Sequence, residues 1–212
     1  LKFQIESSPS NHKQRLLGGI EIVPTQEYKI KKDNKEIGFK KNSFFNKVAL
    51  NIESINDTLK VGEDIYPLRK PYSIKVNKKI EDSIIRRQSY IGLINKNGKI
   101  SYLKTNKDGD YLSTTSSILG SYVISRDSLK PEVKPLNFSL NKDISNQKTI
   151  RLRVYDKTSG IKSYNALIND KWALFEYEPK SNLIFHQIED GIIKNGENNI
   201  NIKVIDGVGN QT

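Results

Sequence analysis

The stretch Ser159–Tyr177, SGIKSYNALINDKWALFEY, decides the fold of the C-terminal part of the chain. Its apolar residues alternate with polar or smaller ones on both sides of Asn169-Asp170, which is typical of two strands joined by a tight turn. Asn and Asp favour such a turn because they tolerate positive φ. The hairpin holds the only tryptophan, which we place at the centre of a core. The expected core residues are Tyr164, Ile168, Trp172, Phe175, Tyr177, Ile202 and Val204.

Period-two segments and turn signals recur along the rest of the chain, and only Glu81–Gln88 favours a helix, with acids at its start and arginines at its end. In the first half we expect strands at Leu1–Ile5, Phe44–Ile55, Tyr72–Val76, Tyr90–Ile94, Ile100–Thr105 and Tyr111–Thr114. In the second half we expect strands at Leu136–Leu140, Thr149–Tyr155, Ile161–Ile168, Trp172–Tyr177, Leu183–Gln187 and Asn198–Ile205.

These strands predict an all-β protein of two antiparallel β-sandwich domains. A length of 212 residues suits one large or two ordinary domains. The polar stretch Ser125–Pro135 contains two prolines and is expected to be a stiff linker. We therefore predict a basic β-sandwich domain over residues 1–128 and a second antiparallel β-sandwich domain over residues 129–212.

The positive charge is concentrated in the first part of the chain. Residues 1–130 carry 24 Lys+Arg and 14 Asp+Glu, and residues 131–212 carry 11 and 10, so the net charges are +10 and +1. A polyanion would therefore meet the first part, although solvated lysines on exposed strands explain the same pattern. The basic clusters are Lys29–Lys32, Lys40-Lys41, Lys78-Lys79 and Arg86-Arg87, with Tyr28, Tyr72 and Tyr90 nearby as candidates for base stacking. Since no recognised nucleic-acid module accompanies them, we expect no nucleic-acid partner.

Few residues of this sequence are candidates for catalysis. There is no cysteine, and His12 and His186 are the only histidines, whereas a catalytic zinc needs three protein ligands. Residues 106–110 (NKDGD) are rich in oxygen ligands but lack the downstream Glu of a calcium loop. We therefore expect no catalytic residue, no metal and no cofactor in this chain.

Asp156 and Asp206 each follow an apolar strand, in VYDKTSG and VIDGVGN. Carboxylates in such places cap turns by accepting hydrogen bonds from local N–H groups. The alternative is that they bind calcium between domains. The residues assigned to turns are Asp156, Gly160, Asn169, Asp170, Asp206 and Asn210.

The segments VYDKTSGIKSYNALINDKWALFEYEPKSNLIFH (154–186) and NNINIKVIDGVGN (198–210) resemble a known module. It is the C-terminal Ig-like module of lysostaphin/LytM-type zinc endopeptidases of Bacteroidota. The resemblance implies an Ig-like or fibronectin type III-like fold for residues 129–212. The segments 44–52, 66–76 and 119–133 are similar to the β-rich region that precedes that module.

The resemblance implies a parent protein that cleaves peptidoglycan crosslinks with a zinc-bound water. The zinc ligands of that family are a His, an Asp and the second His of an H-x-H motif, and no position of this sequence matches them. The zinc would therefore belong to a peptidase domain upstream of this chain. The chain begins at Leu1 with no signal-peptide pattern, which favours a fragment or a processed product.

The function expected from these observations is that of a non-catalytic accessory or interaction module in the cell envelope. It would position a peptidase-like protein or bind an envelope protein partner. The alternative is an adhesin-like module whose basic first domain binds peptidoglycan or another acidic glycan. The expected location is the periplasm or the outer membrane after secretion, and no apolar run approaches the roughly 20 residues of a membrane helix.

Overall fold

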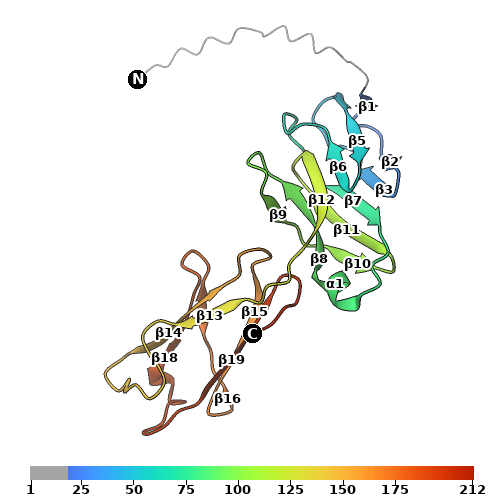
Figure 1. Cartoon of the computed structure of the whole chain (residues 1–212). Coiled ribbons are helices and arrows are strands. Elements are labelled where there is room, and N and C mark those ends of the chain that lie inside the picture. The colour runs from blue at the N-terminus through green and yellow to red at the C-terminus, as the bar shows by residue number, and fades with distance from the viewer. Residues whose placement is uncertain (1–18) are drawn as a thin grey trace, which may run out of the picture.

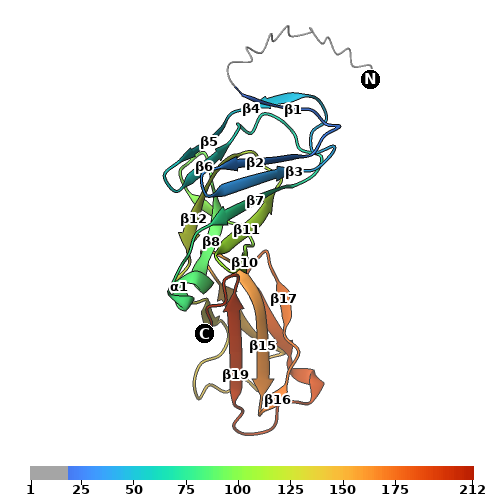
Figure 2. The same cartoon turned by 90° about the vertical axis from the view of Figure 1, so that its right-hand side faces the viewer.

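The computed structural model describes residues 19–212 and shows an all-β chain of five antiparallel sheets (Figure 1). The described strands fall into an N-terminal part, up to Arg126, and a C-terminal part, from Glu132. The two parts lie end to end in both views (Figures 1 and 2). The strand expected at Leu1–Ile5 and His12 lie outside the described residues.

The N-terminal part contains two five-stranded sheets and a two-stranded ribbon. Its strands are β1 (Ile20–Ile22), β2 (Tyr28–Lys32), β3 (Lys35–Phe39), β4 (Val48–Leu50), β5 (Ile52–Ile55), β6 (Thr58–Val61), β7 (Tyr72–Asn77), β8 (Ser89–Ile94), β9 (Ile100–Tyr102), β10 (Asn106–Asp108), β11 (Tyr111–Ser116) and β12 (Gly120–Arg126). The sheet orders are β10-β11-β7-β3-β2 and β5-β6-β12-β8-β9, and β1 pairs with β4. Apolar residues of both large sheets alternate into one core, as period-two burial requires.

A buried tyrosine pair crosses this core. The Tyr72 hydroxyl lies 2.8 Å from the Tyr122 hydroxyl, which in turn donates to Ser116 Oγ at 2.8 Å. Burial raises the pKa of Tyr72 far above its ordinary value. Tyr72 and Tyr90 are both buried, so neither is placed to stack on nucleic-acid bases.

The helix expected at Glu81–Gln88 is confirmed as α1 (Ser83–Gln88). Asp82 caps it, because one of its carboxylate oxygens accepts the backbone N–H groups of Ile84 and Ile85 at 2.8 Å. Arg86 and Arg87 lie in the last turn, where the helix dipole favours positive charge. The helix brings Arg87 and Gln88 to the boundary between the two parts.

The C-terminal part contains a four-stranded and a three-stranded sheet around a second core. Its elements are β13 (Glu132–Pro135), β14 (Thr149–Tyr155), β15 (Ile161–Ile168), β16 (Lys171–Trp172), β17 (Glu176–Glu178), β18 (Leu183–Gln187), the 3-10 helix η1 (Ile188–Asp190) and β19 (Ile200–Asp206). The sheet orders are β13-β14-β18-β17 and β16-β15-β19. Ile168, Phe175 and Val204 are buried in the core as predicted, and Tyr164, Tyr177 and Ile202 pack against it.

The placement of Trp172 in the core is wrong, since this side chain is 62% exposed. Asn169 and Asp170 both have positive φ, 51° and 62°, which confirms the predicted turn. That two-residue turn pairs Ile168 with Lys171 and Leu167 with Trp172. Because Ile168 points into the core, Leu167 and Trp172 point to the opposite face of the sheet.

The predicted linker and the predicted strand Leu136–Leu140 are also wrong in position. The strand lies four residues earlier, at Glu132–Pro135, and pairs with β14 inside the stretch expected to be a linker. Proline is tolerated there because β13 is an edge strand. Only residues 127–131 join β12 to β13, and the predicted domain boundary at 128/129 falls in this connection.

Candidate functional site

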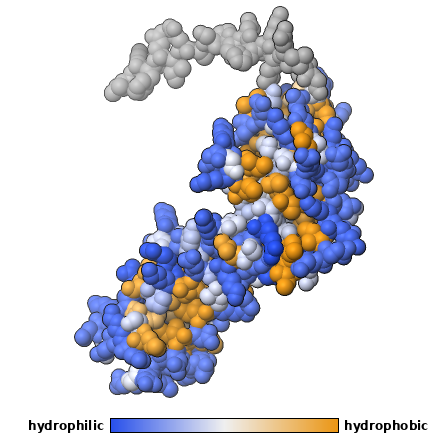
Figure 3. All heavy atoms as spheres, in the orientation of Figure 1, coloured by the Kyte–Doolittle hydropathy of each residue, from blue (hydrophilic) through white to orange (hydrophobic). Residues whose placement is uncertain are grey.

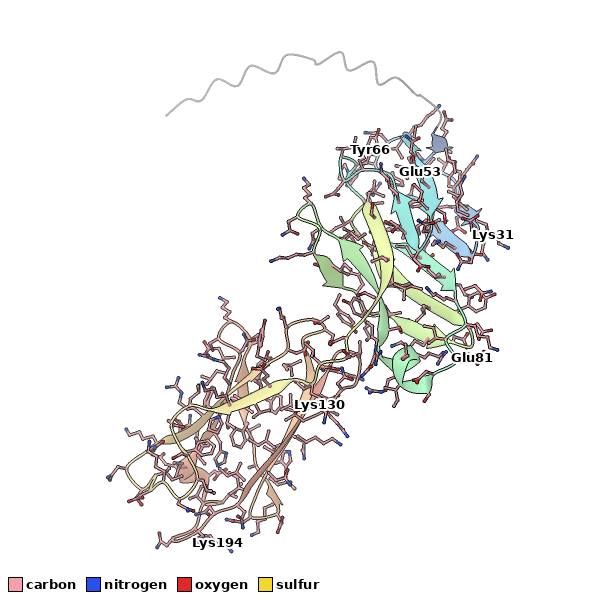
Figure 4. The ribbon with its side chains drawn as sticks, in the orientation of Figure 1. Lys31, Glu53, Tyr66, Glu81, Lys130 and Lys194 are labelled. Carbon is pink, nitrogen blue, oxygen red and sulfur yellow. The ribbon has the colours of Figure 1, made fainter. Side chains whose placement is uncertain are left out.

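The most densely bonded polar cluster of the described residues lies where the two parts meet. We call it the junction and define it by Arg87, Gln88, Asp127, Ser159, Asp206 and Asn210. Figure 4 labels Lys130 beside it and Lys194 at the far tip of the C-terminal part. The C-terminus lies near α1 in both ribbon views (Figures 1 and 2).

Asn210 is the centre of the junction. It is 4% exposed, and its amide nitrogen lies 3.0 Å from Asp127 O, 2.8 Å from Leu129 O and 2.8 Å from Asp206 Oδ2. Its Oδ1 accepts from Gln88 Nε2 at 2.7 Å. Every polar atom of this buried side chain is therefore satisfied, and the bonds join the end of α1, the connection and the end of β19. The turn assignment of Asn210 is thus incomplete, since its side chain reaches the N-terminal part.

Further contacts fix the same boundary. Arg87 donates to Val208 O at 3.4 Å, and the Tyr102 hydroxyl donates to Gly207 O at 3.0 Å. A Cβ at Gly207 would lie 3.0 Å from Tyr102 Cζ of the N-terminal part and 2.5 Å from Ser159 O of its own part. Glycine at this position therefore permits the close approach of Tyr102 to the C-terminal part.

Three carboxylates converge at the junction. Asp127, Asp156 and Asp206 each offer an oxygen within 4.8 Å of the others. The turn prediction is confirmed for Asp156 and Asp206: Asp156 Oδ2 accepts the backbone N–H groups of residues 158–160, and Asp206 Oδ1 accepts those of residues 208–210. Asp127 Oδ2 accepts from Ser159 Oγ at 2.6 Å. Protein donors therefore compensate much of the negative charge in this cluster.

Burial raises the pKa of Asp127, with the charges of Asp156 and Asp206 acting in the same direction and the Ser159 hydrogen bond opposing them. Carboxylate oxygens at this spacing are the ligand type that Ca²⁺ takes. In this cluster, however, N–H and O–H groups already donate to one oxygen of Asp156 and to both oxygens of Asp127 and Asp206. The local geometry is therefore that of capped turns. Sequence reasoning missed Asp127, which lies in the stretch Ser125–Pro135 that was expected to be a linker.

The second notable feature is an exposed apolar surface at β16. Trp172 is 62% exposed and Leu174 is 56% exposed, and Trp172 lies beside the half-buried Leu167 on the outer face. We call Leu167, Trp172 and Leu174 the Trp172 surface. Large apolar side chains gathered at a sheet edge are typical of a contact surface rather than of a folding core.

The backbone beneath the Trp172 surface is firmly anchored. Ala173 N donates to Ala166 O at 3.0 Å, and Leu174 O lies 2.8 Å from His186 Nδ1. The His186 ring is 1% exposed, stacks on Phe175 with 5.2 Å between centroids, and has its Nε2 3.3 Å from Asp190. This histidine thus has a structural position under the strand that carries Trp172.

The remaining candidates are dispersed over the surface. The oxygen-rich segment 106–110 forms strand β10 and the tight turn that leads to β11. Of the basic clusters, Lys29 pairs with Glu36 and Lys78 with Asp57, whereas Lys31 lies on the outer edge of β2 (Figure 4). The structure does not bring these lysines together with the junction.

Comparison of the chain with protein-family models, with curated proteins and with solved structures gives no match. The resemblance to the Ig-like module of LytM-type peptidases therefore stays a prediction. Within residues 19–212, none of the helices has the length and apolar character required to cross a membrane.

Proposed function

We propose that this chain is a non-catalytic interaction module of the cell envelope, built from two β-sandwich units of which the second is Ig-like. Its role is to bind an envelope protein through the Trp172 surface and to hold that partner at a fixed place relative to the N-terminal unit. In the parent protein that the sequence resembles, the positioned domain is a zinc endopeptidase acting on peptidoglycan. The corresponding location is the periplasm or the outer membrane.

The observation that carries this proposal is the exposure of Trp172 on an anchored strand. Exposing a tryptophan to water forgoes the free energy that its burial in the core would contribute. A rigid aromatic side chain loses little conformational entropy on binding, and Trp is enriched among the residues that dominate protein interfaces. The anchored backbone at Ala173 and Leu174 means that the indole needs no reordering of its strand to meet a partner.

The junction supports the positioning role. Buried hydrogen bonds of Asn210 and Gln88 join the two parts across the boundary, so a partner bound at one end has a defined orientation to the other. These buried hydrogen bonds would have to break for the two parts to move apart.

The test is photocrosslinking in an envelope extract. A photoreactive phenylalanine analogue replaces Trp172 in one variant and the exposed Tyr111, on the N-terminal part, in the control variant. We expect one defined envelope protein to crosslink at position 172 and not at position 111, with capture that persists at high salt. The captured protein is then identified and its complex with the Trp172→Ala chain measured. Equal crosslinking at both positions, or an affinity unchanged in Trp172→Ala, would refute the proposal.

A second candidate function is glycan binding through the basic N-terminal part. It is favoured by the edge of β2, where Lys31 and Lys32 form no salt bridge with any residue in the described range 19–212. Binding to peptidoglycan sacculi that falls steeply with salt, and is lost in Lys31→Gln/Lys32→Gln, would support this function instead. Salt-independent retention on sacculi would argue against it.

A further inference from the structure

Four basic side chains lie near one another at the boundary between the two parts. Arg86 and Arg87 belong to the last turn of α1, Lys107 belongs to β10, and Lys162 belongs to β15. We call these four residues the boundary cations. Figure 3 shows a strongly hydrophilic surface where the two parts meet. The first three boundary cations lie in the N-terminal part and the fourth lies in the C-terminal part, so the cluster spans both.

Hydrogen bonds hold three of these side chains in place. Arg86 Nη2 donates to the carbonyl oxygen of Gly109, in the turn that follows β10. Lys107 Nζ donates to Arg87 O at 2.7 Å, which ties β10 to the end of α1. Arg87 in turn donates to Val208 O at 3.4 Å, across the boundary. The cationic groups are therefore ordered before a ligand arrives, which lowers the entropy lost on binding.

A β-bulge places the fourth cation. The register of β15 against β19 shifts between Ile161 and Ser163, so Lys162 is the extra residue of β15. Bulges of this kind redirect a side chain and recur beside functional sites. Ile161 pairs with Asp206, so the bulge lies directly beside the junction. Lys162 is exposed there, next to the cations of the N-terminal part.

Within residues 19–212, no carboxylate forms an ion pair with any of the boundary cations. The nearby carboxylates of the junction accept hydrogen bonds from other donors instead. Arg86 and Lys107 are half-buried, a setting in which charged groups are normally paired. Burial lowers the pKa of Lys107, and the charges of the other three boundary cations act in the same direction. A bound anion would relieve this repulsion between like charges.

The donors that remain open define the kind of anion. An arginine has five N–H donors and a lysine has three. Among the contacts within residues 19–212, Arg86 uses one donor, Arg87 uses two and Lys107 uses one. The donors left on the two arginines alone exceed the roughly four accepting sites of a carboxylate. A phosphate group has three strongly accepting oxygens and a charge of about −1.5 to −2, and guanidinium groups bind it through parallel hydrogen bonds.

We propose that the boundary cations bind a phosphate group, which links the N-terminal and C-terminal parts of the chain. Two sources of this group fit the same chemistry, a soluble phosphate ester and the headgroup of an anionic phospholipid. The site includes neither the Trp172 surface nor the lysines of β2. It therefore stands independently of the proposed function and of the second candidate function.

The first test is a titration of the full chain with inorganic phosphate, followed by NMR of the backbone amides at constant ionic strength. We expect saturable shifts at Arg87, Lys107 and Lys162. The variant Lys107→Gln/Lys162→Gln should bind at least about tenfold more weakly, because two charge-assisted contacts are lost. The control variant Lys148→Gln/Lys194→Gln removes the same charge from exposed positions, with Lys194 at the far tip (Figure 4), and should bind like the unchanged chain. Absence of saturable shifts, or equal weakening in both variants, would overturn the proposal.

The second test measures stability, because a ligand that binds only the folded chain stabilises it. Urea unfolding is followed with and without inorganic phosphate at equal ionic strength. Phosphate should raise the unfolding midpoint of the unchanged chain and of the control variant, but not that of Lys107→Gln/Lys162→Gln. If this variant fails to fold, Lys162→Gln alone replaces it, since that side chain is exposed. A midpoint that rises equally with and without the boundary lysines would contradict the assigned site.

Vesicles distinguish the two sources of the phosphate group. Cosedimentation of the chain with vesicles of phosphatidic acid and phosphatidylcholine is compared with cosedimentation with phosphatidylcholine alone. Retention on the first vesicles that inorganic phosphate reverses, and that Lys107→Gln/Lys162→Gln lacks, assigns the site to a lipid headgroup. Saturable binding of inorganic phosphate without retention on vesicles assigns it to a soluble phosphate ester. Neither binding nor retention would leave the boundary cations without a phosphate ligand and would refute the proposal.

Discussion

Replacing Asn210 by alanine should loosen the junction between the two parts. The side chain is 4% exposed and makes four bonds of 3.0 Å or shorter, to Gln88, Asp127, Leu129 and Asp206. At about 1 kcal/mol of net stabilisation per bond, and with buried partners left unsatisfied, the expected loss is about 4 kcal/mol. This is at the upper end of the range for single substitutions.

Urea denaturation followed by circular dichroism measures this loss. The control is Asn165→Ala, which removes an exposed amide on β15 and should change the free energy of unfolding by less than about 0.5 kcal/mol. A double-mutant cycle of Gln88→Ala with Asn210→Ala isolates the bond that crosses between the parts, and we expect a coupling of about 1 kcal/mol. Small-angle X-ray scattering should show a larger radius of gyration for Asn210→Ala. A loss below about 1 kcal/mol together with unchanged scattering would refute the assignment of Asn210 as the centre of the junction.

Two further predictions concern pH and the core. Since the pKa of Asp127 is raised in the folded chain, the stability linked to its protonated form is present below the unfolded pKa of about 3.9 and is lost as pH rises through the folded value. The variant Asp127→Asn keeps an acceptor for the Leu129 N–H but cannot titrate. We therefore expect its free energy of unfolding to fall less steeply with pH over this range than that of the unchanged chain. Equal slopes for the two proteins would contradict this prediction. In a denaturant melt, Phe175→Ala should lower the free energy of unfolding by about 3–5 kcal/mol, whereas Trp172→Ala should lower it by less than about 1 kcal/mol. The reverse order would mean that Trp172 belongs to the core.

Most of the hairpin at Asn169-Asp170 could be predicted from the sequence. Its turn follows from residues that tolerate positive φ, and its strands follow from period-two alternation. The side that Trp172 faces was also contained in the sequence, because a two-residue turn sets Leu167 opposite Trp172 once Ile168 is buried. The prediction failed because aromatic size was given more weight than register.

The junction could not be predicted in the same way. Gln88 and Asn210 are separated by 122 positions, and polar residues in connections carry no periodicity that reports their partners. Asp206 was found because its turn is local, and Asp127 was missed because its partners are distant. Strand β13 was likewise not predicted, since Pro131 before it and Pro135 at its end are typical of a linker and are equally compatible with an edge strand.

The two edges of the sheet β16-β15-β19 differ in a way that bears on the proposed function. At β16 the edge strand has two residues, so few backbone groups are open and the exposed feature is the side chain of Trp172. At β19 the outer side of Val204 and Asp206 is paired with the backbone of Thr212 and Asn210. Side-chain anchors give specificity for one partner surface. The proposed partner is therefore selected at β16, by the side chain of Trp172.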